Sequence, residues 1–66
     1  MTVTVNGQPR ELPPGTTIRA LIESLGLANA ACAAELNKTL VPKRNHPSRE
    51  LREGDSLELV SLVGGG

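Results

Sequence analysis

Three consecutive glycines, Gly64, Gly65 and Gly66, end the sequence and are its most distinctive candidate for chemistry. Glycine has no side chain and retains much backbone freedom, so this segment is expected to be a thin arm that another protein can hold by its backbone alone. The carboxylate of Gly66 is then the reactive group at the tip. Because a carboxylate is anionic and a poor electrophile, it needs activation, most simply adenylation with ATP.

The chain itself offers no means of performing this activation. Its glycines do not have the spacing of a phosphate-binding loop or a dinucleotide fingerprint, so a separate enzyme must supply ATP, metal and phosphate-binding groups. A glycine-rich end is also typical of a frayed terminus or a cloning remnant. The position of the glycines directly after an apolar segment favours the functional interpretation.

The other residue types that commonly perform chemistry are isolated. Cys32 is the only cysteine, which excludes an internal disulfide and a Cys-x-x-Cys pair; among alanines, we expect it to be a small buried apolar residue. His46 lies beside Pro47 in an expected loop, where we predict a solvated, non-catalytic side chain. With no paired acid and base and no metal constellation, we predict that the chain is not an enzyme and holds no metal or stable cofactor.

Composition and charge exclude several classes of partner. The 66 residues include 7 basic and 7 acidic side chains and no Phe, Tyr or Trp, so neither a positive field nor stacking platforms are available for nucleic acid. No apolar run approaches the roughly 20 residues that cross a bilayer. The lone cysteine and the absence of a signal-peptide pattern at the start predict a cytoplasmic location.

The elements that must position the tail are predicted from the pattern of apolar and turn residues. Val3 and Val5 alternate with threonines, the period of a half-buried strand, and Asn6-Gly7 favours a tight hairpin to a second strand over residues 8–12. Thr17 can cap a following helix. The apolar residues of that helix share one face and are Ile18, Leu21, Ile22 and Leu25, and Gly26 is placed to end it.

The second half of the chain predicts further strands. Residues 31–37 are expected to form the third strand, and residues 40–51 an irregular connection with a short strand near its end. Residues 56–63 form the last strand, with Leu57 and Leu59 on its core face. The order predicts an α+β fold with the β-grasp layout: a mixed sheet of four or five strands and one helix across it, as a single domain over residues 1–63.

If Leu57 and Leu59 face the helix, Val60 and Leu62 point outward beside the tail. Exposed apolar residues next to a reactive end form a reasonable docking surface for a partner enzyme. Lys43, Arg44 and Arg49 are expected to form a solvated basic face, or alternatively to dock an acidic patch on that enzyme.

Several short motifs together resemble the ThiS-like, ubiquitin-like sulfur carriers of thiamin (thiazole) biosynthesis, in order and over nearly the whole chain. They are Val5-Asn6-Gly7, Pro14-Gly15-Thr16-Thr17-Ile18, Leu36-Asn37, Val41-Pro42, residues 51–55 and Val63-Gly64-Gly65-Gly66. The combination of Asn-x-x-x-Val-Pro with a terminal Gly-Gly is the most specific part. In one respect the chain differs from ubiquitin-like modifiers, because apolar rather than basic residues precede the glycines, which argues against conjugation to lysines.

The resemblance implies a mechanism and its partners. A ubiquitin-activating-like adenylyltransferase adenylates Gly66, a cysteine desulfurase indirectly supplies sulfur, and thiazole synthase takes sulfur from the resulting thiocarboxylate. Val63, Gly64 and Gly65 then thread the partner's tunnel. A sulfur carrier for molybdopterin, sulfur amino acids or tRNA thiolation remains an alternative, as do a ubiquitin-like modifier and a binding module whose tail is chemically idle.

Overall fold

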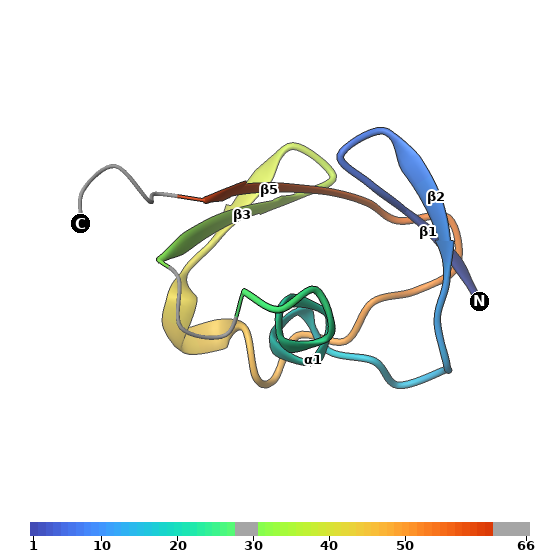
Figure 1. Cartoon of the computed structure of the whole chain (residues 1–66), viewed down its shortest axis with the longest axis horizontal. Coiled ribbons are helices and arrows are strands. Elements are labelled where there is room, and N and C mark those ends of the chain that lie inside the picture. The colour runs from blue at the N-terminus through green and yellow to red at the C-terminus, as the bar shows by residue number, and fades with distance from the viewer. Residues whose placement is uncertain (28–30, 62–66) are drawn as a thin grey trace.

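The computed structural model describes residues 1–27 and 31–61, which form two layers (Figure 1). A five-stranded mixed sheet makes one layer, and a single helix packs across one of its faces. The elements in chain order are β1 (Thr2–Val5), β2 (Gln8–Glu11), α1 (Ile18–Ser24), β3 (Cys32–Leu36), β4 (Thr39–Val41), the short 3-10 helix η1 (Lys43–Asn45) and β5 (Ser56–Ser61). The predicted α+β, β-grasp arrangement is confirmed.

The first hairpin forms as its turn residues predict. Val5 pairs with Gln8, so Asn6 and Gly7 are the two central residues of the turn, with φ of 51° and 83°. Positive φ at both positions is the geometry that matches the twist of two antiparallel strands, and asparagine and glycine adopt it at the lowest cost.

Helix α1 is fixed at both ends by local hydrogen bonds. The Thr17 hydroxyl oxygen accepts from the Ala20 N–H at 3.1 Å, which satisfies a donor of the first turn. At the other end the Leu27 N–H donates to the Ile22 carbonyl at 3.1 Å, and Gly26 has a φ of 76°. This is a Schellman ending, so the predicted cap and stop of the helix are both confirmed.

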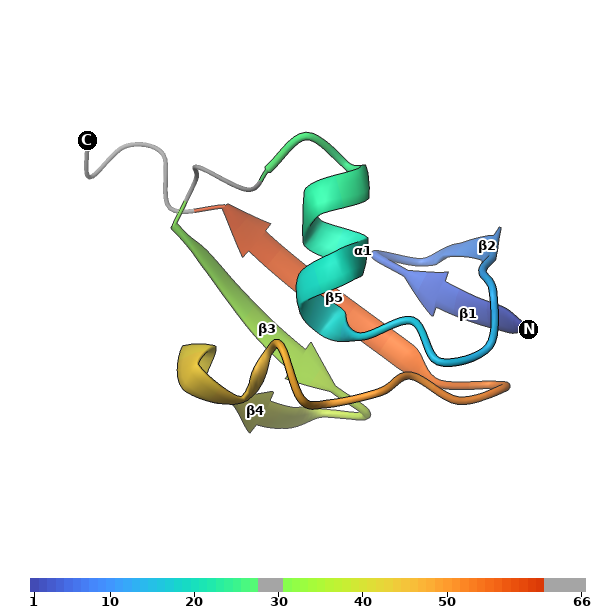
Figure 2. The ribbon, with the colours of Figure 1, turned by 90° about the horizontal axis from the view of Figure 1, so that it is seen from below.

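The last strand occupies the middle of the sheet, whose order is β2-β1-β5-β3-β4 (Figure 2). Strand β1 pairs with it in parallel, but only at Ser56 and Leu57. Strand β3 pairs with it antiparallel from Leu57 to Ser61. Beyond Leu57, β5 therefore has a strand partner on one side only, which leaves its end at the border of the sheet.

The core lies between the sheet and α1. Ile18 and Leu21 of the helix are 0% and 1% exposed, and Leu57 in the middle of the sheet is 0% exposed. Ala34 is also fully buried, which accounts for one of the alanines of β3. None of the helices in the described part of the chain is long and apolar enough to cross a membrane.

The connection after β3 differs from the prediction. Its short strand is β4 at the start, paired with β3 through a turn in which Asn37 and Lys38 have φ of 51° and 70°. The strand expected near residue 51 is wrong, because Glu50 makes only an isolated bridge with Thr17. An edge strand needs a partner, and β3 offers its free edge to the residues that immediately follow the turn.

Candidate functional site

The end of β5 leads directly to the residues predicted to perform the chemistry. Ser61 is the last residue described, paired with Cys32 of β3. The predicted reactive Gly66, the tunnel residues Val63, Gly64 and Gly65, and the docking residue Leu62 lie outside the described residues. Their roles stay predictions.

Asn6 secures β5 where its pairing with β1 stops. The Asn6 side-chain oxygen accepts from the Leu59 N–H at 2.7 Å, and the Asn6 N–H donates to the Leu57 carbonyl at 2.9 Å. The hairpin turn thus supplies hydrogen bonds that a longer β1 strand would otherwise have to provide. The strand is held firmly up to two residues before Ser61.

Val60 points away from the helix, as predicted. It is 57% exposed, whereas Leu57 is 0% exposed and Leu59 is half-buried against the core. Leu40 of β4 is 63% exposed, and these two are the large exposed apolar residues of residues 1–27 and 31–61. Sequence reasoning missed Leu40, because without the register of β4 nothing placed it on a face.

The strand registers show that Val60 and Leu40 share the outer face of the sheet. Val60 is opposite Ala33, and Glu35, two residues along β3 and so on the same face, is opposite both Glu58 and Leu40. We call these five residues the outer patch. It lies on the face that α1 does not cover.

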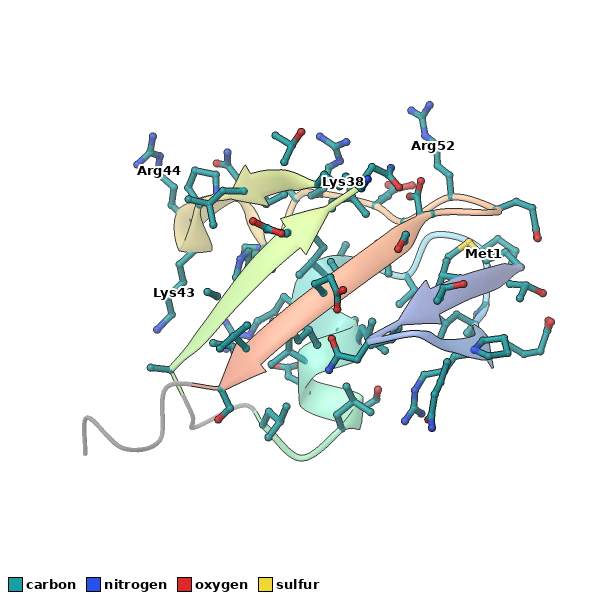
Figure 3. All side chains as sticks on the ribbon, turned by 90° about the horizontal axis from the view of Figure 1, so that it is seen from above. Met1, Lys38, Lys43, Arg44 and Arg52 are labelled. Carbon is teal, nitrogen blue, oxygen red and sulfur yellow. The ribbon has the colours of Figure 1, made fainter. Side chains whose placement is uncertain are left out.

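Basic side chains lie around the border of this face rather than at its centre. Figure 3 shows Lys43 and Arg44 beside β4, Lys38 at the β3–β4 turn and Arg52 before β5. Lys43, Arg44 and Arg49 are exposed, which confirms the predicted solvated basic residues.

His46 does not lie where the sequence predicted. It is 4% exposed rather than solvated, and its Nε2 lies 3.1 Å from the Val41 carbonyl oxygen. Its own carbonyl accepts from the Arg19 N–H at 3.0 Å, so the residue joins η1 to β4 and α1. The prediction of a solvated side chain is wrong, because the ring is turned inward and lies against the Val41 carbonyl oxygen.

Cys32 is partly buried and packs against the core, in keeping with a small apolar role. Within the part of the chain that the structure describes, no group of three or more His, Cys, Asp or Glu side chains could hold a metal ion.

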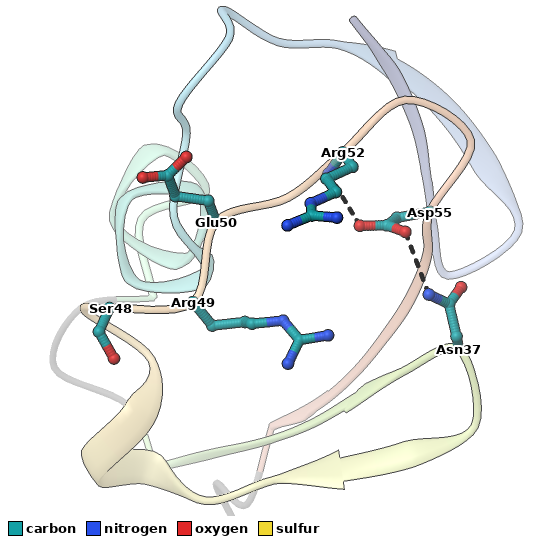
Figure 4. A pocket seen from close by; sticks show the side chains of 6 residues that line it. All are labelled: Asn37, Ser48, Arg49, Glu50, Arg52 and Asp55. Carbon is teal, nitrogen blue, oxygen red and sulfur yellow. Dashed lines mark hydrogen bonds between the residues drawn. The ribbon is translucent and has the colours of Figure 1, made fainter.

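A polar cavity of about 640 Å³ lies at the opposite end of β5 from the tail (Figure 4). Arg49 and Arg52 point into it. Asp55 accepts from the Asn37 side-chain amide at 3.0 Å and from the Arg52 backbone N–H at 2.8 Å. The Asn37 side-chain oxygen in turn accepts from the Ser56 N–H at 3.0 Å. This network ties the β3–β4 turn to the start of β5, so the Asn of the Asn-x-x-x-Val-Pro motif has a structural role.

Comparison with known proteins decides the family. A model of the ThiS family matches residues 3–66. The chain belongs to the ThiS family. Sulfur carrier protein ThiS of Thermus thermophilus is 38% identical over 64 residues, which are 97% of this chain and 98% of that protein. The crystal structure of thiamine biosynthesis protein ThiS from Geobacter metallireducens matches with a TM-score of 0.82 and 28% identity, covering 100% of both chains.

A second group of relatives is much longer than the ThiS proteins. Thiazole synthase of Paramagnetospirillum magneticum is 35% identical over 66 residues, which are 100% of this chain and 20% of that protein. The chain thus spans about one fifth of the length of the thiazole synthases that it matches. In those proteins a ThiS-like segment and other sequence share one polypeptide.

Proposed function

We propose that this member of the ThiS family is a sulfur carrier for thiamin biosynthesis whose working group is the carboxylate of Gly66. The observation that carries the proposal is the family match over residues 3–66, which includes the glycine segment. The central strand that leads to this segment, and the exposed Val60 beside its end, are the arrangement that presentation of a tail to an enzyme requires. The protein is a cosubstrate of enzymes rather than an enzyme.

The chemistry takes two steps on a partner adenylyltransferase. A Gly66 carboxylate oxygen attacks the α-phosphorus of ATP and pyrophosphate leaves, which gives an acyl adenylate. Hydrosulfide, released when a thiol reduces the persulfide that a cysteine desulfurase provides, then attacks the acyl carbon. AMP leaves with the bonding electrons, and the sulfur loses its proton. The resulting thiocarboxylate carries the sulfur. Val63, Gly64 and Gly65 contribute by threading the enzyme's tunnel, since glycines present only backbone.

Thiazole synthase is the proposed receiver of the sulfur. The support is that proteins named thiazole synthase contain a segment similar to the whole of this chain. Placing a carrier and its acceptor in one polypeptide raises their effective concentration, an arrangement useful for two proteins that act on each other. Because the sequence of reactions requires ATP and a desulfurase, we propose that it takes place in the cytoplasm.

The proposed docking surface beside the tail comprises Val60 and Leu62. Val60 is 57% exposed on the face that no helix covers, so its methyl groups are available to a partner without any change of fold. Docking beside the tail would direct the glycines to the enzyme's active site.

The decisive experiment is the intact mass of the protein after incubation with ATP, adenylyltransferase and a sulfide source. The expected result is the mass change of one oxygen replaced by sulfur, in the complete chain and not in a chain lacking Gly66. Subsequent incubation with thiazole synthase and its substrates should return the carrier to its original mass. If no sulfur is gained with several activating enzymes, the proposal is wrong, and a binding module with an idle tail becomes the better description.

A further inference from the structure

The outer patch combines apolar and acidic residues in an unusual order. Three of its residues are apolar: Val60 and Ala33, which are cross-strand partners, and Leu40 of β4. Glu58 and Glu35 are also cross-strand partners, and Glu35 is opposite Leu40 on its other side. Among the described residues the large exposed apolar side chains both belong to this patch. Exposed apolar side chains that gather on one face are typical of an interaction surface.

The position of Glu35 directly opposite Glu58 disfavours folding of the sheet. Directly opposite residues of antiparallel strands have Cβ atoms about 4.5–5.5 Å apart, and like charges at that separation destabilise the sheet. The one ion pair formed within residues 1–27 and 31–61 joins Arg19 and Glu23 on α1, so neither Glu35 nor Glu58 is paired there with a cation.

We propose that the outer patch docks the adenylating enzyme through an arginine of that enzyme, placed between Glu35 and Glu58. This inference rests on the proposed function, since it concerns the enzyme that activates the tail. A guanidinium group is a planar fork of donors that can bind carboxylates on both sides, which an ammonium group does less well. Its aliphatic stem can lie on Leu40 or Val60, whose exposed methyl groups flank the acidic pair.

The charge pattern also defines the rest of the partner surface. The patch is acidic at its centre, while Lys38, Lys43 and Arg44 lie at its border. The complementary surface has a cation at the centre and acidic residues around it. Because the net charge of the chain is zero, this pattern rather than a general attraction sets the specificity of docking.

The test uses Glu35→Gln and Glu58→Gln, singly and together, with Glu23→Gln as the matched control on the helix layer. Docking is measured as the affinity of the adenylating enzyme for chains that also lack Gly66, so that it is determined separately from the chemistry. Neutralising both glutamates should weaken binding roughly tenfold or more at low salt and less at high salt. Glu23→Gln should leave the affinity unchanged.

A second measurement distinguishes docking from a structural role. Each single Gln variant should raise the Tm of the free protein by about 1 to 8 °C, because it removes the cross-strand repulsion. Glu58→Lys should also raise the Tm while weakening docking further. Unchanged affinity in the double variant, or weaker binding together with a lower Tm, would overturn the inference.

The outcomes also separate this inference from the proposed function. If the complete chain gains sulfur but the glutamates have no effect on binding, only the inference fails. If the glutamates are needed for binding but no sulfur is gained, docking stands and the carrier chemistry fails. If the unsubstituted chain does not bind the enzyme at all, both are wrong.

Discussion

Replacing Val60 with aspartate should weaken activation of the carrier while leaving its fold intact. Full burial of a valine side chain is worth about 1.5–3 kcal/mol. Since 57% of Val60 is exposed in the free protein, about 0.9–1.7 kcal/mol remains to be gained when a partner covers it. Aspartate loses this gain and adds the cost of desolvating a charge, so kcat/KM for adenylation should fall at least about fivefold.

The same strand provides the contrast that makes this prediction sharp. Leu57 faces the core and is 0% exposed, so Leu57→Ala should cost about 2–5 kcal/mol of the free energy of unfolding. Val60→Asp should cost no more than about 1 kcal/mol, the range of strand preferences at an exposed position. Urea unfolding of the two variants measures this difference directly.

The assay for Val60→Asp is the initial rate of ATP-dependent adenylation as a function of carrier concentration. Val60→Thr is the control, because it keeps the shape and introduces no charge, and it should lose less activity than the aspartate variant. An unchanged kcat/KM for Val60→Asp would show that the enzyme docks elsewhere. A loss of stability greater than about 2 kcal/mol would contradict the outward orientation of Val60.

Two further substitutions and one deletion test other parts of the structure. Asn37→Ala should lower the free energy of unfolding, measured in urea, by about 2–4 kcal/mol, because it removes two side-chain hydrogen bonds and places alanine at a φ of 51°. A loss below about 1 kcal/mol would contradict the structural role of Asn37. His46→Ala should cost about 2–4 kcal/mol and leave adenylation of the folded protein unchanged. A loss of adenylation without a loss of stability would instead give His46 a catalytic role. Deleting Gly66 should abolish sulfur gain, measured by intact mass, with unfolding changed by less than about 0.5 kcal/mol; retained sulfur gain would exclude Gly66 as the acceptor.

The parts of the fold that could be predicted are those determined by neighbouring residues. Asn6-Gly7 specifies its turn through backbone geometry, and Thr17 and Gly26 delimit α1 through bonds within four or five residues. The outward position of Val60 followed from simple alternation along β5. These features need no knowledge of what packs against them.

The features that could not be predicted depend on contacts between distant parts of the chain. Lys38 adopts a positive φ that lysine seldom adopts, so the β3–β4 turn lacked a recognisable signal and β4 was missed with it. Only the strand register shows that Leu40 lies on the outer face and that Glu35 and Glu58 are cross-strand partners. His46 is polar and follows a basic segment, yet a carbonyl of β4 lies within reach of its ring. Tertiary pairing decided each of these positions.

The number of residues between β5 and Gly66 limits which surface of the protein could direct the proposed chemistry. Five residues follow Ser61, and an extended chain covers at most about 3.3–3.6 Å per residue, so Gly66 can reach no more than roughly 18 Å from the end of β5. Strand β5 itself has 6 residues and is about 20 Å long. An enzyme that docks at the polar cavity, beyond the far end of β5, would have to extend along the whole of β5 and along the segment after it to contact Gly66. Docking on the outer patch, where Val60 adjoins Ser61, places the enzyme's active site within reach of Gly66, and this distance argument favours the patch independently of its composition.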